Sequence, residues 1–153
     1  MELKVDSFDN EIDVVTPRLE LYAVRDNNGK PCHGLAVLLD CKEGVYACVT
    51  VSFGTYIRYK NAAYIDTNNC PWAEKLLTEA GVAKKTSRTY ASGFCAYPLY
   101  VFDEKFLREI GEENYETYLR DYEQLAAELA ANGKKPPEIL PIEPMPNSIP
   151  QDY

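Results

Sequence analysis

Histidine is almost missing from this sequence: His33 is the single one in 153 residues. The five cysteines are an odd number and form no Cys-x-x-Cys pair, so neither a disulfide framework nor a paired-ligand zinc site is predicted. No apolar run approaches the roughly 18 residues that a membrane-spanning helix needs, and the N-terminus lacks a basic-then-apolar signal pattern. We therefore expect a cytoplasmic protein with reduced thiols and no membrane association.

Clustered glycines are missing too, so the sequence contains neither a Walker-type phosphate loop nor a dinucleotide fingerprint. Asp66-Thr67-Asn68 could begin a calcium loop, but Pro71 and Leu77 stand where that loop needs glycine and glutamate. We interpret residues 66–69 as an Asx turn that leads into a helix cap. The sequence predicts no metal and no other cofactor.

Acidic residues are abundant and unevenly placed. The formal net charge is -8, and residues 103–129 alone contain nine acidic and three basic side chains. A surface of this sign does not favour direct contact with nucleic acid, whose phosphates attract basic residues. The hydrophobic fraction of 46% and the charged fraction of 26% are ordinary for one soluble globular domain.

Short apolar and alternating runs dominate the first two thirds of the chain. They predict strands near residues 3–5, 18–23, 34–39, 46–53, 62–65 and 97–102, with a turn at Asn28-Gly29. Pro71 is expected in the first turn of a short helix that Asn69 or Cys70 caps and Gly81 ends. Residues 84–88 are expected to form a basic loop, and Pro98 places the last strand at an edge or makes its start irregular.

A long helical segment is predicted after residue 102, with Asp103 as its cap and an interruption at Gly111. Six prolines after Lys134 predict an extended tail. We therefore expect an α+β fold: an antiparallel sheet of four or five strands, one short helix, an acidic helical segment and a Pro-rich tail. The predicted boundaries are a single domain over residues 1–132, with the acidic segment at 103–132, and a tail over 133–153.

Two motifs bracket the stretch around which the chain is organised. They are Asp66-Thr67-Asn68-Asn69, and Ser92-Gly93-Phe94-Cys95 followed by Tyr97-Pro98-Leu99-Tyr100. In these motifs the sequence resembles an uncharacterised family, a domain of unknown function in small proteins from plasmids, phages and conjugative elements of gut Gram-positive bacteria. The resemblance covers about residues 18–102 and leaves the acidic segment and the tail outside. It implies a mobile-element setting, in which small proteins bind host machinery, and it carries no catalytic residue to this chain.

The leading functional prediction is a non-catalytic, protein-binding regulator of a mobile element. Its most concrete form is an acidic inhibitor of a host DNA-acting defence enzyme, of the anti-CRISPR or antirestriction type, whose carboxylates imitate phosphates. The candidate binding residues, taken from the two motifs and the acidic segment, are Asp66, Asn68, Asn69, Trp72, Tyr97, Tyr100, Glu109, Glu112, Glu113 and Glu116. The twelve tyrosines fit a binding patch or a core equally well, and the acidic segment also fits a merely solvated face.

Two alternatives stay open. A cysteine-dependent enzyme would use Cys95 as its nucleophile, with His33 as the available base. A self-associating structural subunit would use the helical stripe of Tyr118, Tyr122, Leu125 and Leu129.

Overall fold

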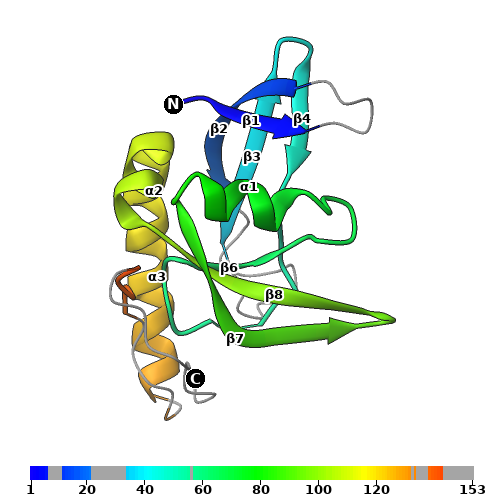
Figure 1. Ribbon diagram of the computed structural model, residues 1–153. Helices are drawn as coiled ribbons and strands as arrows, with labels where there is room; N and C mark the ends of the chain where they lie inside the picture. The colour runs from blue at the N-terminus through cyan, green and yellow to red at the C-terminus, as the bar shows by residue number, and fades with distance from the viewer. Residues whose placement is uncertain (7–11, 22–33, 56, 132, 134–137, 143–153) are drawn as a thin grey trace.

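The computed structural model describes residues 1–6, 12–21, 34–55, 57–131, 133 and 138–142, which contain two antiparallel sheets and three helices (Figure 1). The first sheet has the order β1-β2-β3-β4, with strands β1 (Leu3–Asp6), β2 (Ile12–Leu21), β3 (Leu35–Cys41) and β4 (Gly44–Cys48). The second has the order β5-β6-β8-β7, with strands β5 (Thr50–Val51), β6 (Ala62–Ile65), β7 (Ala83–Ser92) and β8 (Cys95–Phe102). The helices are α1 (Ala73–Glu79), α2 (Glu104–Gly111) and α3 (Glu113–Ala131).

The α+β class predicted from the sequence is confirmed, and its strands divide between two sheets where a single sheet was expected. The division lies inside the expected strand 46–53. Val49 separates β4 from β5, and its backbone N–H donates to the carbonyl of Val37 at 3.0 Å. The chain thus crosses from one sheet to the other without a turn residue that would reveal the crossing in the sequence. The expected Asn28-Gly29 turn lies outside the described residues.

Residues 84–88 belong to β7, so the prediction of a basic loop is wrong. Burial alternates along this segment: Lys85 and Ser87 are exposed, whereas Thr86 and Arg88 are buried. Side chains that alternate between the two faces are typical of a β-strand. β7 is one of the two outer strands of its sheet. Lysine is common on outer strands because its charge discourages pairing with another chain.

The start of α1 also differs from the prediction. Trp72 occupies the N-cap position, with no side-chain cap, and Pro71 lies before the helix and not in its first turn. The Asx turn is confirmed, because Asp66 Oδ1 accepts from the Asn69 backbone N–H at 3.2 Å. The Asn69 side-chain amide also donates to Asp66 Oδ2, at 2.9 Å. Asn69 is thus part of the turn and does not cap the helix.

The acidic segment forms two helices, as predicted, and Asp103 caps the first of them through the Lys105 N–H at 3.2 Å. The break falls at Glu112, which has a positive φ of 48°. Gly111 is therefore the last residue of α2 and not the break itself. A Cβ at this position would lie 2.6 Å from Leu19 Cδ2. Its missing side chain lets the end of α2 approach β2 closely.

Helix α3 packs on the rest of the chain through tyrosines. Tyr115, Tyr118 and Tyr122 are fully buried, and their hydroxyls donate to the Glu104 carboxylate at 2.9 Å, the Lys60 carbonyl at 2.5 Å and the Ile57 carbonyl at 2.8 Å. Buried tyrosine is stable when its hydroxyl has such an acceptor. The predicted self-association stripe is therefore wrong, since Tyr118, Tyr122 and Leu125 are used inside the chain.

Part of the predicted tail returns to the domain and lies against residues 57–61. We call residues 138–142 the strap. Glu138 pairs with Tyr59 in a parallel bridge, and the fully buried Asn61 side chain binds both backbone groups of Leu140, donating at 2.7 Å and accepting at 2.9 Å. The same Asn61 amide donates to the Phe102 carbonyl at 2.8 Å. One buried amide thus joins the strap, the segment 57–61 and the end of β8.

Replacing Asn61 with alanine is expected to lower the free energy of unfolding by about 3 kcal/mol, because it leaves several buried backbone groups without hydrogen bonds. Urea unfolding measures this loss. The control is Asn68→Ala, on an exposed turn residue, where a change within about 0.5 kcal/mol is expected. Equal stability of the two variants would contradict the structural role of Asn61.

Candidate functional site

The hairpin of β7 and β8 extends beyond the body of its sheet. β6 pairs with β8 only from Leu99 to Val101, whereas the β7–β8 pairing continues outward to Ser92 opposite Cys95. Residues 89–98 therefore form a two-stranded projection, which we call the ribbon, and its tip points away from the molecule (Figure 1). These ten residues include no charged side chain, although 26% of the whole chain is charged.

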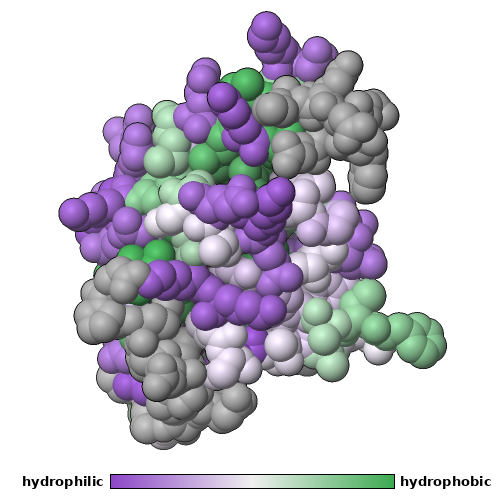
Figure 2. Space-filling view, viewed as in Figure 1, coloured by the Kyte–Doolittle hydropathy of each residue, from purple (hydrophilic) through white to green (hydrophobic). Residues whose placement is uncertain are grey.

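A large apolar side chain stands at the tip of the ribbon. Gly93 and Phe94 make a two-residue turn, and Gly93 has a φ of 62°, which glycine adopts without steric cost. Phe94 is fully exposed, at 110% of its reference area. In Figure 2 the projection at the lower right is green and white, with no hydrophilic residue coloured purple at its end. The turn thus presents an aromatic ring to solvent on an uncharged support.

A bulge at the base sets the ribbon off from the rest of β7. The register with β8 shifts between Lys85 and Thr89, and the Thr86 hydroxyl replaces the missing strand pairing. It donates to the Leu99 carbonyl at 2.8 Å and accepts from the Arg88 N–H at 3.2 Å. Arg88 is buried here near Tyr64, and burial lowers the pKa of its guanidinium. A bulge bends its strand, which is a common way to redirect a hairpin.

One side of the ribbon is held by an aromatic cluster. The ring of Phe53 stacks on Tyr90 at 4.2 Å between centroids and lies 5.0 Å from Tyr97 and 5.5 Å from Tyr64. Aromatic pairs at these distances add to the stability that burial gives. The chain before β6 thus contacts both strands of the ribbon at Tyr90 and Tyr97, so the inner part of the projection is supported.

The Asx turn lies beside the inner part of the ribbon. Extending the register of Tyr64 opposite Leu99 places Asp66 opposite Tyr97. The pKa of the Tyr97 phenol is raised, first by loss of hydration, then by its hydrogen bond with the Cys95 thiol and by the negative charge of Asp66. Of the predicted binding residues, Asp66, Asn69 and Tyr97 therefore lie in one region, and Asn68 is exposed in the same turn.

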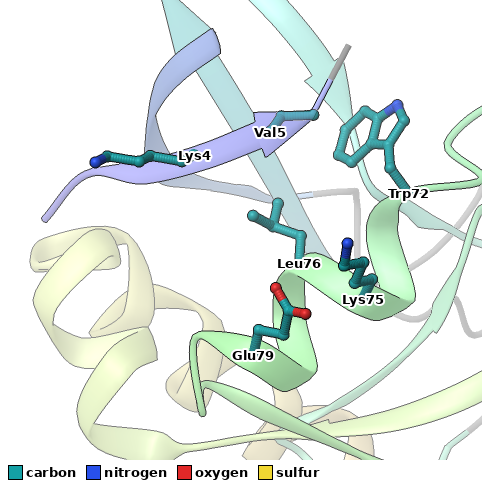
Figure 3. A pocket seen from close by; sticks show the side chains of 6 residues that line it. All are labelled: Lys4, Val5, Trp72, Lys75, Leu76 and Glu79. Atoms are coloured by element: carbon teal, nitrogen blue, oxygen red, sulfur yellow. The ribbon is translucent and has the colours of Figure 1, made fainter. Parts of the chain in front are cut away.

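Two predicted binding residues lie elsewhere. Tyr100 is only 2% exposed and donates its hydroxyl to Glu74 at 2.7 Å, so its assignment to a binding surface is wrong. Trp72 is half-buried against Tyr46, with ring centroids 5.7 Å apart. It lines a cavity of about 30 Å³ between α1 and β1, where Leu76 points from the helix toward the strand (Figure 3). That volume fits about one water molecule and no larger ligand.

The four glutamates predicted as a mimic face gather where α2 meets α3. Glu109, Glu112, Glu113 and Glu116 are all exposed there, and we call this surface the acidic corner. Arg108 binds Glu116 at 2.6 Å and Glu104 at 3.5 Å, so the nearest basic side chain already has two carboxylates. Figure 1 places these helices on the side of the molecule opposite the ribbon tip. Apart from Trp72 and Tyr100, the predicted binding residues therefore lie on two distant surfaces.

No group of three or more potential metal ligands occurs in the part of the chain that the structure describes. None of its described helices is both long and apolar enough to cross a membrane. The second proposed catalytic residue, His33, lies outside the described residues. Cys95 is partly exposed and contacts Tyr97.

The exposed Phe94 is not among the binding residues predicted from the sequence, although it stands inside one of the two bracketing motifs. The available signal was the uncharged run from Thr89 to Pro98 with a glycine at its centre. Reading residues 84–88 as a loop concealed this signal, because it removed the first strand of the hairpin.

The backbone at Glu112 gives a test of the acidic corner. Its φ of 48° is unfavourable for a residue with a Cβ, so Glu112→Gly is expected to raise the free energy of unfolding by about 1 kcal/mol. The matched control Glu109→Gly, inside α2, is expected to lower it by about 1 kcal/mol. Thermal or urea unfolding measures both values, and destabilisation by the two variants alike would contradict a strained corner.

Comparison with known proteins gives one match, to a protein family. The family described as "Domain of unknown function (DUF4313)" matches residues 23–122. The match includes α2 and continues to Tyr122 in α3, so the family unit reaches past residue 102 and contains the acidic corner. No curated protein sequence and no solved structure matches the chain. Because the match spans well over half of the chain, this protein belongs to the DUF4313 family of domains of unknown function.

Proposed function

We propose that this protein is a non-catalytic regulator that binds another protein through the ribbon. The observation that carries the proposal is Phe94, a fully exposed aromatic ring at the tip of an uncharged projection. A side chain of this size contributes about 1.5–3 kcal/mol when a partner's pocket removes it from water. Aromatic residues are also prominent among the few side chains that supply most of the binding energy of protein interfaces.

The support beneath Phe94 favours the same function. Phe53 and Tyr90 stack on one side of the ribbon, and the Thr86 bulge is closed by two hydrogen bonds. A projection that is already ordered loses little conformational entropy when it binds. These contacts therefore make the ribbon a suitable recognition element.

Phe94→Ser is expected to abolish or strongly weaken partner capture, because it removes the apolar anchor without touching the core. The experiment compares proteins retained from a host lysate by the wild type and the variant, with the retained partner then titrated as a purified protein. Val45→Ser is the matched control, because Val45 is 59% exposed beside the turn between β3 and β4. Equal affinity of wild type and Phe94→Ser would refute binding through the ribbon.

The acidic corner supports a second, more specific function. Glu109, Glu112 and Glu113 are exposed, and no ion pair neutralises them among the described residues. Such a group of carboxylates could occupy the basic groove of a nucleic-acid enzyme, as an inhibitor carried by a mobile element and directed at a host DNA-acting defence enzyme would do. Electrostatic attraction would speed association and weaken as salt rises.

The double variant Glu109→Lys/Glu113→Lys is expected to weaken binding to such an enzyme by about tenfold at low salt, with the difference shrinking as salt rises. Affinity is measured by titration at several salt concentrations. The control Glu2→Lys/Glu43→Lys changes the net charge equally on exposed residues elsewhere. The same loss in both double variants would exclude a specific role of the acidic corner.

A further inference from the structure

We infer that the partner adds a β-strand to the open edge of β7 along Thr89–Ser92, beside the pocket that receives Phe94. This inference rests on the proposed function, since it specifies how the ribbon is recognised. β7 is an outer strand of the second sheet, so one edge of the ribbon has no neighbouring strand among the described residues. Strand addition supplies affinity through backbone hydrogen bonds at such an edge.

The register shows which backbone groups face outward. In an antiparallel hairpin with a two-residue turn, the pair next to the turn is hydrogen-bonded and the following pairs alternate. Ser92 opposite Cys95 and Tyr90 opposite Tyr97 are therefore the bonded pairs. The N–H and C=O groups of Thr89 and Ala91 point away from β8, toward the open edge.

Pro98 agrees with this register. It stands opposite Thr89, in a pair that needs no hydrogen bond between β7 and β8. Its nitrogen, which carries no hydrogen, faces the other side of β8, where the pairing with β6 ends at Leu99. This explains how proline is accommodated in an inner strand of the sheet.

The outer edge of the ribbon lacks the features that usually prevent pairing. Residues 89–92 contain no charge, no proline and no bulge, whereas the inner half of β7 carries Lys84, Lys85 and the Thr86 bulge. Thr89 and Ala91 are exposed and small, so they leave room for an approaching strand. The edge is protected near the body of the molecule and open near Phe94.

The occupant is an extended segment of a different protein, and a second copy of this chain is disfavoured. Four residues from each of two copies would bury far less than the roughly 1,200 Å² of a stable interface. Each copy also carries a formal net charge of -8, which opposes self-association. A different protein with a net positive charge is attracted to this chain and not repelled by it. Such a partner can also enlarge the interface with a pocket for Phe94.

Ala91→Pro tests this inference, because it removes an outward N–H without removing a β7–β8 hydrogen bond. The matched control is Ala96→Pro: Ala96 is the direct cross-strand partner of Ala91 and its N–H faces the opposite edge. Affinity for the purified partner is expected to fall about tenfold or more in Ala91→Pro and to stay near the wild-type value in Ala96→Pro. Circular dichroism and thermal unfolding verify that both variants fold.

The possible outcomes distinguish strand addition to β7 from the proposed function, which is binding through the ribbon. If Phe94→Ser weakens binding while Ala91→Pro and Ala96→Pro bind equally, strand addition is refuted and binding through the ribbon stands. If neither Phe94→Ser nor Ala91→Pro weakens binding, the proposed function itself fails. A dimeric mass in solution that Ala91→Pro converts to a monomer would make a second copy the occupant and overturn the inference as stated.

Discussion

The buried amide of Asn61 joins three parts of the chain that are far apart in sequence. It binds the carbonyl of Phe102 at the end of β8 and both backbone groups of Leu140 in the strap. The neighbouring carbonyls of Ile57 and Lys60 accept hydrogen bonds from the α3 tyrosines. The segment 57–61 is thereby fixed from both sides, and it leads directly into β6, on which β8 is aligned. The position of the ribbon depends on this junction.

The structure separates apolar and acidic surface features. The ribbon carries Phe94 and no charge, while Glu109, Glu112 and Glu113 lie on the helices at the opposite side (Figure 1). An apolar anchor supplies affinity over short distances, whereas an acidic surface attracts a basic partner over about a Debye length. Our proposal assigns the contact to the ribbon, and the acidic corner would then attract a partner or bind a second surface of it.

Much of the fold could be predicted from the sequence because local signals agree with the final structure. Asp103 as a cap, the Asx turn at Asp66 and the division of the acidic segment all depend on neighbouring residues. The crossing at Val49 depends on its contact with β3, which no local pattern contains. Residues 84–88 belong to β7 through its pairing with β8, which a bulge interrupts. Interpreting residues 84–88 as a loop removes the first strand of the hairpin, so the sequence predicts the turn at Asp66 beside the ribbon but not Phe94 at its tip.

Site-specific photocrosslinking from position 94 measures most directly whether the ribbon contacts the partner. A photoreactive phenylalanine analogue would be placed at Phe94, at Val45 or at Glu113, three exposed positions on separate surfaces, and irradiated with the partner. An efficient crosslink is expected from position 94 and none from position 45. Crosslinking from position 113 alone would contradict binding through the ribbon and place the interface on the acidic corner.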